Sequence, residues 1–359
     1  MTPKILTIIG ARPQFIKAAP VSLALGRQGI EEVIVHTGQH FDSNMSDIFF
    51  DDLEIPNPAY NLGIGGGSHG ENTGRMIEAL EKVLQEVSPD LVIVYGDTNS
   101  TLAGALAAAK LNIPVAHVEA GLRSFNRRMP EEINRILTDH ASTMHFVPTQ
   151  TAEENLYNEG VSGDGVHLVG DVMYDASILY GAKAKQTSYI LQTLELQPKS
   201  YVLATIHRAE NTDFPERLST IFHALGRFNI LTILPLHPRT RKLLEANGIE
   251  LPSNVKAIDP VGYLDMMLLT QNAMLVATDS GGVQKESFFS RVPCVTLRDQ
   301  TEWIELIEGG WNRLASPNSE ESIIQALGLA LGSCGDDIEP YGSGNASTLI
   351  SEQIIRDLN

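Results

Sequence analysis

Short apolar runs alternate with longer amphipathic stretches along almost the whole chain. Leu91–Tyr95 is apolar at every position, as in a strand buried on both faces of a parallel sheet, and Thr101–Lys110 has the length and spacing of a helix. The strands expected in this way are Ile5–Ile9, Glu32–His36, Leu91–Tyr95, Val115–Val118, Met144–Val147, Val166–Val169, Tyr201–Thr205, Leu231–Leu234, Val255–Ile258, Met274–Thr278, Cys294–Leu297 and Arg313–Ala315. Alternating strands and helices predict parallel sheets built from βα units.

The number of expected strands indicates two domains rather than one. Twelve strands are too many for one comfortable sheet, so the chain of 359 residues is predicted to form two doubly wound α/β domains. The break between the domains is expected near Gly170, ahead of a helix at about Met173–Ala184.

Composition restricts the class of ligand and the compartment. The chain holds 26 Lys and Arg residues against 44 Asp and Glu residues, a formal net charge of −18, which disfavours binding to nucleic acid or to an anionic membrane. No apolar run reaches the ~18 residues of a membrane-spanning helix, and the N-terminus lacks the layout of a signal peptide, so a cytoplasmic protein is expected. Cys294 and Cys334 lie far apart and outside any metal-ligand spacing, so no structural zinc is expected.

Polar and glycine-rich clusters follow nearly every expected strand at its carboxyl end. They are Gly10–Gln14, His36–His40, Gly96–Ser100, Glu119–Arg123, His207-Arg208, His237-Pro238 and Asp279–Gly282. Open α/β sheets bind ligands outside the carboxyl ends of their strands, at the point where the strand order reverses. Two such sheets that face each other are expected to line a ligand cleft with both sets of clusters.

Two of these clusters have the composition of anion-binding turns. Asp279–Gly282 precedes a helix, where free backbone N–H groups and the helix dipole favour a phosphate, although an ordinary helix cap explains the same residues. Glu286, farther along that helix, either faces a ribose diol or simply favours the dipole. Arg12 and Lys17 place two cations near the first turn, which suits a diphosphate, with an ordinary surface pair as the alternative. The first turn is not a GxGxxG sequence, which weakens a dinucleotide site there.

Carboxylates gather at two other strand ends. Asp97 is either the cap of the next helix or a carboxylate of the cleft, since the three residues that follow it suit the cap equally well. The stretch His117–Arg135 contains three carboxylates and four arginines directly behind an apolar segment. Its acidic pair, Glu131 and Glu132, follows Pro130 at a helix start, where negative charge also suits the dipole.

Two histidines stand at strand ends in the second half of the chain. His207 and His237 are expected on the same side of one sheet, which favours a functional site more than a lone histidine would. No HExxH zinc motif occurs in the sequence.

Taken together, the clusters resemble the non-hydrolysing UDP-N-acetylglucosamine 2-epimerase family. The matching stretches are Gly10–Lys17 (GARPQFIK), Gln39-His40, Gly96–Thr98, His117–Arg123, Pro130–Arg135, His207-Arg208, Asp279–Gly282 and Arg298-Asp299. They span most of the chain in the family's order. Each match is weak alone, and the set is highly specific.

The resemblance implies two Rossmann-like domains in the glycosyltransferase-B arrangement, facing each other across a cleft. A C-terminal helix, here Ala346–Leu358, would pack on the first domain. The expected domains are therefore residues 1–169 with 346–359, and residues 170–345. The resemblance also implies a homodimer that acts on a UDP-sugar and needs neither NAD nor a metal.

The reaction implied by the resemblance inverts C2 of the sugar without redox chemistry. UDP leaves C1 as the C2 proton is removed, an acetamidoglycal forms, and UDP adds back while a proton returns to the other face. This requires proton-transfer groups on both faces and positive or N–H stabilisation of the leaving diphosphate. The matched catalytic residues are Asp97, Glu119, Glu131 and His207. The matched substrate-binding residues are Arg12, Lys17, Arg123, Arg135, Arg208, His237, Ser280, Gly281, Gly282 and Glu286.

Within that set, Arg123 and Arg135 are expected to orient the carboxylates and control their ionisation. The assignment of each carboxylate to one face of the sugar stays open.

The chain departs from the family pattern at several positions. The usual TRPE reads Ala11-Arg-Pro-Gln14, Trp303 replaces a usual arginine, and Met266 replaces a usual aromatic residue. Asp42 replaces a glutamine and no arginine lies between Asn61 and Asn72, which weighs against the second, activating UDP-sugar site of bacterial relatives. These changes resemble the branch that acts on UDP-2,3-diacetamido-2,3-dideoxyglucuronate, a precursor of cell-surface polysaccharide.

Three other activities compete with this interpretation. A hydrolysing 2-epimerase would release free N-acetylmannosamine, a glycosyltransferase of the same fold would need an acceptor site, and a sugar-nucleotide sensor would have no need for Glu119 and Glu131. An NAD-dependent epimerase of the short-chain type is disfavoured, because none of the nine tyrosines has a lysine four residues on.

Overall fold

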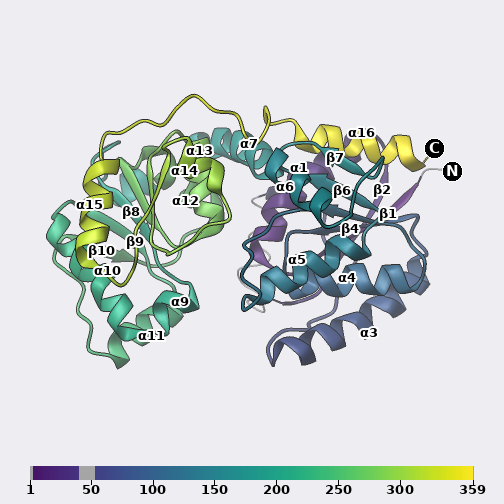
Figure 1. Ribbon diagram of the computed structural model, residues 1–359, viewed down its shortest axis with the longest axis horizontal. Helices are drawn as coiled ribbons and strands as arrows, with labels where there is room; N and C mark the ends of the chain where they lie inside the picture. Colours follow the sequence, from purple (N-terminus) through teal and green to yellow (C-terminus); the bar gives the residue numbers. More distant parts are fainter. Residues whose placement is uncertain (1–2, 40–52, 359) are drawn as a thin grey trace. The chain divides into compact units, whose positions relative to one another are not determined.

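The computed structural model describes residues 3–39 and 53–358 and divides into two α/β units (Figure 1). Unit 1 comprises Met1–Ile178 and Glu339–Asn359, and unit 2 comprises Leu179–Ile338. Gly170, where the sequence places the break, lies just ahead of α7 (Val172–Thr187), and the division between the units falls within that helix.

Unit 1 is built on a seven-stranded parallel sheet with the order β3-β2-β1-β4-β5-β6-β7. The strands are β1 (Lys4–Ile9), β2 (Glu31–His36), β3 (Tyr60–Asn61), β4 (Leu91–Tyr95), β5 (Val115–Val118), β6 (Met144–Val147) and β7 (Val166–Leu168). Because the order reverses between β1 and β4, the carboxyl ends of these two strands mark the ligand-binding edge of a doubly wound sheet.

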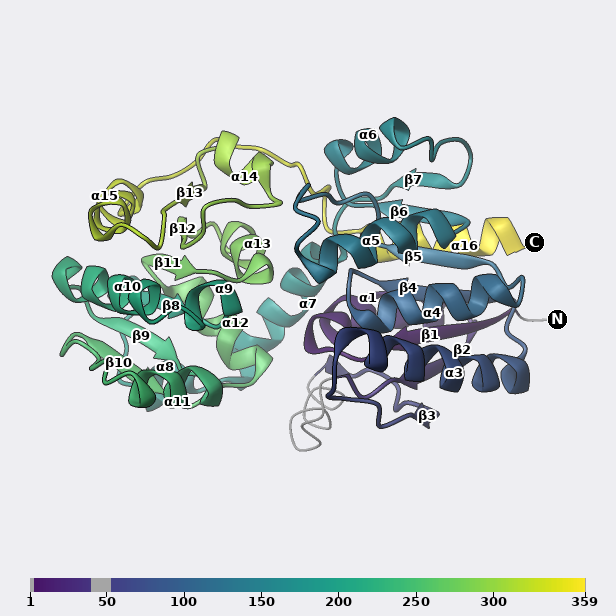
Figure 2. The ribbon, with the colours of Figure 1, turned by 60° about the horizontal axis from the view of Figure 1, so that its bottom comes forward.

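Helices cover both faces of this sheet. They are α1 (Arg12–Arg27), α3 (His69–Val87), α4 (Asn99–Lys110), α5 (Pro130–Ala141), α6 (Gln150–Asn158), the first part of α7, and α16 (Ala346–Leu358). Figure 2 shows α3, α4 and α5 side by side on one face, and their apolar sides close the core over β1 and β4. In α4, a Cβ atom at Gly104 would lie 2.7 Å from Ile8 Cδ1, so the glycine allows this helix to approach the sheet closely.

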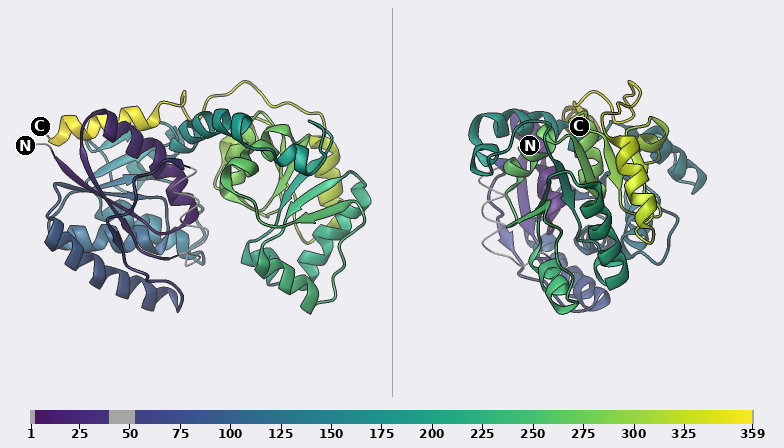
Figure 3. Two further views of the ribbon diagram at one scale, coloured as in Figure 1. Left: turned by 180° about the vertical axis from the view of Figure 1, so that it is seen from behind. Right: turned by 90° about the vertical axis from the view of Figure 1, so that its left-hand side faces the viewer.

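The C-terminal helix α16 packs along α1 on the other face of unit 1, as the resemblance implies (Figure 3). Its first turn is capped by Asp175 of α7. The Asp175 carboxylate accepts hydrogen bonds from Ala346 N (3.1 Å), Ser347 N (2.9 Å) and Ser347 Oγ (2.6 Å). A side chain from a distant helix therefore satisfies backbone N–H groups that α16 leaves open at its start.

Unit 2 repeats the design with a six-stranded parallel sheet of order β10-β9-β8-β11-β12-β13. The strands are β8 (Val202–Thr205), β9 (Thr232–Pro235), β10 (Val255–Ile258), β11 (Leu275–Thr278), β12 (Cys294–Thr296) and β13 (Asn312–Leu314). The helices are α8 (Ile190–Thr193), α9 (Ala209–Thr212), α10 (Pro215–Phe228), α11 (Pro238–Ala246), α12 (Tyr263–Asn272), α13 (Gly281–Phe289), α14 (Ile304–Glu308) and α15 (Glu320–Ala330). Here the order reverses between β8 and β11.

The predicted fold class is confirmed, since both sheets are parallel and doubly wound. Each of the twelve expected strands is present, with ends that match or shift by one residue. The two-residue strand β3 was not expected, because Tyr60–Asn61 is too short to give an apolar pattern. Among the described residues, no helix combines the length and the apolar character needed to cross a membrane.

The Asp175 cap gives a local test of the fold. Replacing Asp175 with Ala removes three hydrogen bonds from the first turn of α16, and a lost cap costs about 1 kcal/mol. We expect hydrogen–deuterium exchange of the α16 amides to accelerate roughly fivefold or more. Asp164→Ala, at an exposed position, is the control and should leave α16 exchange unchanged. Equal exchange in both variants would show that Asp175 does not hold this helix.

Candidate active site

The strand ends at the reversal point of unit 1 bring Lys17 and Glu119 together. Glu119 directly follows β5, is 8% exposed, and forms an ion pair with Lys17 of α1. Its backbone is left-handed (φ 74°), a conformation that costs energy in a residue with a side chain and that recurs at functional sites. Its N–H donates to Phe146 O at 3.0 Å, which holds the turn in place.

Gly96, after β4, lies against this ion pair. Its φ is 64°, and a Cβ atom there would lie 3.1 Å from Lys17 Nζ and 3.3 Å from Glu119 Oε2. Glycine is therefore required twice, once for the left-handed backbone and once for the close approach. The next residue, Asp97, stands at the same edge of the sheet.

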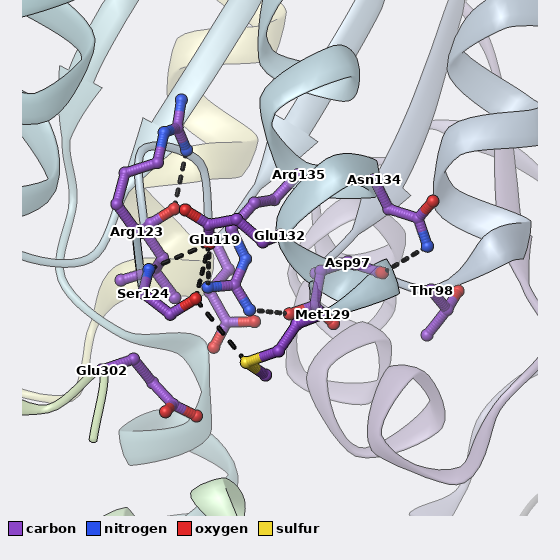
Figure 4. Close-up of polar contacts among 12 residues, drawn as sticks. Asp97, Thr98, Glu119, Arg123, Ser124, Met129, Glu132, Asn134, Arg135 and Glu302 are labelled. Atoms are coloured by element: carbon purple, nitrogen blue, oxygen red, sulfur yellow. Dashed lines mark hydrogen bonds and ion pairs between the residues drawn. The ribbon is translucent and has the colours of Figure 1, made fainter. Parts of the chain in front are cut away.

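Asp97 is not the cap of α4, so of the two roles that the sequence left open, that of a cleft carboxylate remains. Thr98 caps α4 by accepting a hydrogen bond from Thr101 N. The Asp97 carboxylate is paired with Arg135 of α5, with Oδ2 and Nη2 2.5 Å apart, and Asn134 Nδ2 donates to Asp97 O at 3.0 Å (Figure 4). Two side chains of α5 thus hold Asp97: Arg135 binds its carboxylate and Asn134 binds its backbone carbonyl.

The expectation that Arg123 orients a carboxylate of the catalytic set is wrong. Its buried guanidinium donates to Asp139 (Nη1–Oδ2 2.7 Å) and to Glu159 (Nε–Oε1 2.8 Å, Nη2–Oε2 2.6 Å), not to a catalytic carboxylate. The chain turns back at Glu119 and Gly121, both left-handed, and a Cβ atom at Gly121 would lie 2.2 Å from the backbone of α6. This turn brings Arg123 to the end of α6 and away from the strand edge.

Glu131 and Glu132, the acidic pair at the start of α5, have different surroundings. Glu132 is buried and accepts from Ser124 N, Ser124 Oγ and Phe125 N, each at 2.9 Å, and from Arg135 Nη1 at 3.1 Å. Arg135 therefore pairs with both Glu132 and Asp97. Glu131 is exposed and has no hydrogen bond or ion pair to any residue that the structure describes, so it remains available for chemistry.

In unit 2, the reversal point is organised by Asp279 at the end of β11. This fully buried carboxylate accepts from His207 N, Arg208 N and Asn211 Nδ2, each at 3.1 Å, across the end of β8. The His207 ring is half exposed, with Nδ1 3.4 Å from Asp279 Oδ1. Asp279 therefore shapes the loop and orients the His207 ring, a role that the sequence did not assign to it.

The Asp279–Gly282 turn opens α13 as expected. Ser280 is the cap, and the helix begins at Gly281, slightly earlier than the sequence suggested. A Cβ atom at Gly281 would lie 2.6 Å from Glu302 Oε1 and 3.7 Å from Arg208 Nη2, so charged side chains surround this helix start. Glu286 is buried one turn farther along α13.

Trp303, which replaces the usual arginine of the family, lies beside this turn. Its ring is buried beneath Lys285, with Nζ 4.1 Å from the ring centroid, and its Nε1 would lie 3.5 Å from a Cβ atom at Gly281. Trp303 therefore places an aromatic ring, with Lys285 stacked on it, next to the start of α13.

The other residues singled out in the sequence lie away from the Lys17–Glu119 pair and the start of α13, or outside the described residues. Arg12 is the first residue of α1 and is half-buried. His237 is exposed at the end of β9 and caps α11 by accepting from Arg239 N at 3.2 Å, so its ring has a structural partner. Gln39 accepts from Ser100 N at 3.0 Å, while Asp42 lies outside the described residues.

Gln14 is a site residue whose role the sequence did not reveal. Its Oε1 accepts from Gly10 N (2.8 Å) and Ala11 N (3.0 Å), and its Nε2 donates to Tyr95 O and to Thr101 Oγ1, each at 3.0 Å. The amide thus ties the β1–α1 turn to the end of β4. The carboxylate of the usual TRPE motif has no N–H to donate to Tyr95 O, which explains why an amide suits this position.

The described residues include no group of three or more His, Cys, Asp or Glu side chains arranged to hold a metal ion. The strand edge of unit 1 carries the carboxylates of Asp97 and Glu119, and the start of α13 in unit 2 has Arg208 and Glu302 beside it.

Comparison with known proteins identifies the family. The family model described as UDP-N-acetylglucosamine 2-epimerase matches residues 24–355. The chain belongs to the UDP-N-acetylglucosamine 2-epimerase family. It is 54% identical to the UDP-2,3-diacetamido-2,3-dideoxy-D-glucuronate 2-epimerase of Pseudomonas aeruginosa, over 98% of this chain and 99% of that protein. It is 45% identical to the UDP-N-acetylglucosamine 2-epimerase of Methanocaldococcus jannaschii, over 99% of this chain and 98% of that protein.

Solved structures of the family agree with this fold. The crystal structure of the M. jannaschii UDP-GlcNAc 2-epimerase in complex with UDP-GlcNAc and UDP gives a TM-score of 0.92 at 43% identity, covering 99% of this chain and 100% of that one. The Neisseria meningitidis UDP-GlcNAc 2-epimerase bound to UDP-GlcNAc gives 0.89 at 33% identity, covering 98% and 100%.

The ionised Asp139 gives a pH prediction for this family member. Burial alone would raise the pKa of Asp139, but the charges and hydrogen bonds of His117 and Arg123 outweigh it and hold the pKa below its usual value. A carboxyl group with a lowered folded pKa stabilises the fold above its unfolded pKa, and this contribution disappears as the pH falls through the folded pKa. We expect Asp139→Asn to lower the melting temperature most near neutral pH, with the gap to wild type narrowing below about pH 4.

Thermal unfolding at a series of pH values measures this gap. Asp164→Asn, at an exposed position, is the control and should follow wild type throughout. A gap that stays constant or widens on acidification would mean that Asp139 is not ionised in the folded protein.

Proposed function

We propose that this protein is a non-hydrolysing UDP-sugar 2-epimerase that interconverts UDP-GlcNAc and UDP-ManNAc. The observation that supports this most is the cluster at the strand edge of unit 1, where Glu119 in a left-handed turn meets Lys17 and stands beside Asp97. A protein that only bound sugar nucleotides would have no use for such a cluster of carboxylates. Relatives at 45% identity bear the name of this enzyme.

In the proposed reaction, a base removes the C2 proton while the C1–O bond breaks and UDP leaves with the electron pair. The resulting acetamidoglycal takes a proton at C2 on the opposite face, and a diphosphate oxygen of UDP re-forms the bond to C1. Asp97, Glu119, Glu131 and His207 are the proposed proton-transfer groups. The ammonium of Lys17 beside Glu119 favours the ionised carboxylate, which is the form that accepts a proton.

Unit 2 is proposed to hold the leaving group. The backbone N–H groups at the start of α13 and the guanidinium of Arg208 suit the negative charge that develops on UDP as the C1–O bond breaks. Glu286, in the same helix, is the proposed ribose contact. We also propose that the enzyme works as a cytoplasmic homodimer, as the family resemblance implies.

A second candidate substrate is UDP-2,3-diacetamido-2,3-dideoxyglucuronate. It is favoured by the 54% identity to the P. aeruginosa enzyme named for that sugar, against 45% to the M. jannaschii enzyme. The chemistry at C1 and C2 is the same for both sugars, so the proposed residues keep their roles.

Isotope exchange tests the reaction and the sugar together. The protein is incubated in deuterated water with each UDP-sugar in turn and followed by NMR. We expect deuterium to enter C2 while UDP remains on the sugar, with the preferred sugar exchanging faster. Release of free N-acetylmannosamine would show a hydrolysing enzyme, and binding without exchange would show a sensor.

The two glutamates at the start of α5 provide a matched pair of variants. Glu131→Gln removes an exposed proton-transfer group, so C2 exchange should fall at least ~100-fold with an unchanged melting temperature, and Glu119→Gln should abolish exchange as well. Glu132→Gln should instead lower the melting temperature, because the loop that it holds loses charged hydrogen bonds. Full exchange in Glu131→Gln or Glu119→Gln would remove that residue from the catalytic set.

A further inference from the structure

A buried array of charged side chains lies behind the strand edge of unit 1 and has no part in the proton transfers proposed above. It consists of His117 on β5, Asp139 on α5, Arg123 after β5 and Glu159 at the end of α6. His117 and Asp139 are 0% exposed and Arg123 is 5% exposed. One end of the array reaches the catalytic edge, since His117 Nε2 lies 2.7 Å from Gly96 O.

Both ring nitrogens of His117 face hydrogen-bond acceptors. A backbone carbonyl only accepts, so Nε2 must bear the hydrogen that it shares with Gly96 O. Nδ1 lies 2.7 Å from Asp139 Oδ1, and the other oxygen of Asp139 accepts from Arg123 Nη1 at 2.7 Å and from Gly121 N at 3.2 Å. The buried ion pair with Arg123 favours the ionised form of Asp139. An ionised Oδ1 can only accept, so Nδ1 is also a donor.

We propose that His117 is a positioning residue of the 2-epimerase, held as a doubly protonated imidazolium that fixes the Gly96 carbonyl. The proposal rests on the function proposed above. Gly96 N donates to Val118 O at 3.0 Å, so both sides of this left-handed glycine are held by β5. Since Asp97 is the next residue and Gly96 contacts Lys17 and Glu119, the His117 bond fixes the geometry of the whole carboxylate cluster.

The surroundings of His117 match a buried positive charge. Asp139 and Glu159 are negative and Arg123 is positive, so with an imidazolium the array is neutral as a whole, which limits the cost of burying it. On β6, His145 stands opposite His117 in register, and its Nε2 donates to Asp139 O at 2.7 Å. Burial, together with the nearby charge of His117, lowers the pKa of His145, so this second ring is neutral.

The two rings make an internal comparison for NMR. In protein labelled with ¹⁵N at histidine, we expect His117 to show both ring nitrogens protonated at neutral pH, and His145 to show one protonated and one bare nitrogen. Loss of His117 resonances in His117→Gln assigns them. A single-proton ring at His117 near neutral pH would overturn the proposal.

Kinetics test the positioning role. The amide of His117→Gln has N–H groups at only one end, so it cannot donate to both Gly96 O and Asp139. We expect kcat for C2 exchange to fall about 30-fold or more, while KM changes less than about threefold. His223→Gln, at an exposed position on α10, should behave as wild type. An unchanged kcat in His117→Gln would overturn the proposal.

Asp139→Asn supplies a second route if His117→Gln does not fold. It keeps the His117 ring but removes the charge that requires the second proton, so we expect a singly protonated His117 and a lowered kcat. A His117 ring that stays doubly protonated in this variant would overturn the assigned cause. If wild type shows no C2 exchange at all, the proposed function fails, whereas the NMR spectrum still reports the state of His117.

Discussion

The ion pair between Lys17 and Glu119 is the interaction on which the proposed site depends. It joins the helix after β1 to the end of β5, across β4, and it closes over Gly96. Both side chains are largely buried, so removing either partner would leave a charge without its counterpart, a change that costs about 3–5 kcal/mol at buried sites. The pair can form only because the strand order reverses between β1 and β4, which opens room at the strand ends.

Side-chain hydrogen bonds and ion pairs around this pair hold the neighbouring residues of the site in place. Gln14 joins the β1–α1 turn to the end of β4, and Arg135 pairs with Asp97. His117, at one end of the charged array, bonds the carbonyl of Gly96. The left-handed backbone of Glu119 is held by its N–H bond to Phe146 O and by its ion pair with Lys17.

Much of this arrangement could be predicted from the sequence, because apolar runs fix the strands and parallel strands must place their carboxyl ends together. Thus Asp97, Glu119 and Lys17 could be assigned to one edge of unit 1, and Ser280 to the helix start in unit 2. The partners of Arg123 could not be predicted, since Asp139 and Glu159 are distant in sequence and meet it only through the turn at Gly121. The sequence also could not assign different roles to the adjacent residues Glu131 and Glu132. The structure separates them, because Glu131 is exposed and Glu132 is buried.

In the proposed enzyme, unit 1 carries the proton-transfer groups and unit 2 binds the nucleotide. Calorimetric titration with UDP tests this division most directly. Glu119→Gln should bind UDP within about threefold of wild type, because the change removes a proton-transfer group and no nucleotide contact. Gly281→Val should weaken UDP binding at least ~10-fold, because its Cβ atom would lie 2.6 Å from Glu302 Oε1 and force the side chains at the start of α13 to move. If Gly281→Val bound UDP normally while Glu119→Gln lost it, the two units would have been assigned the wrong roles.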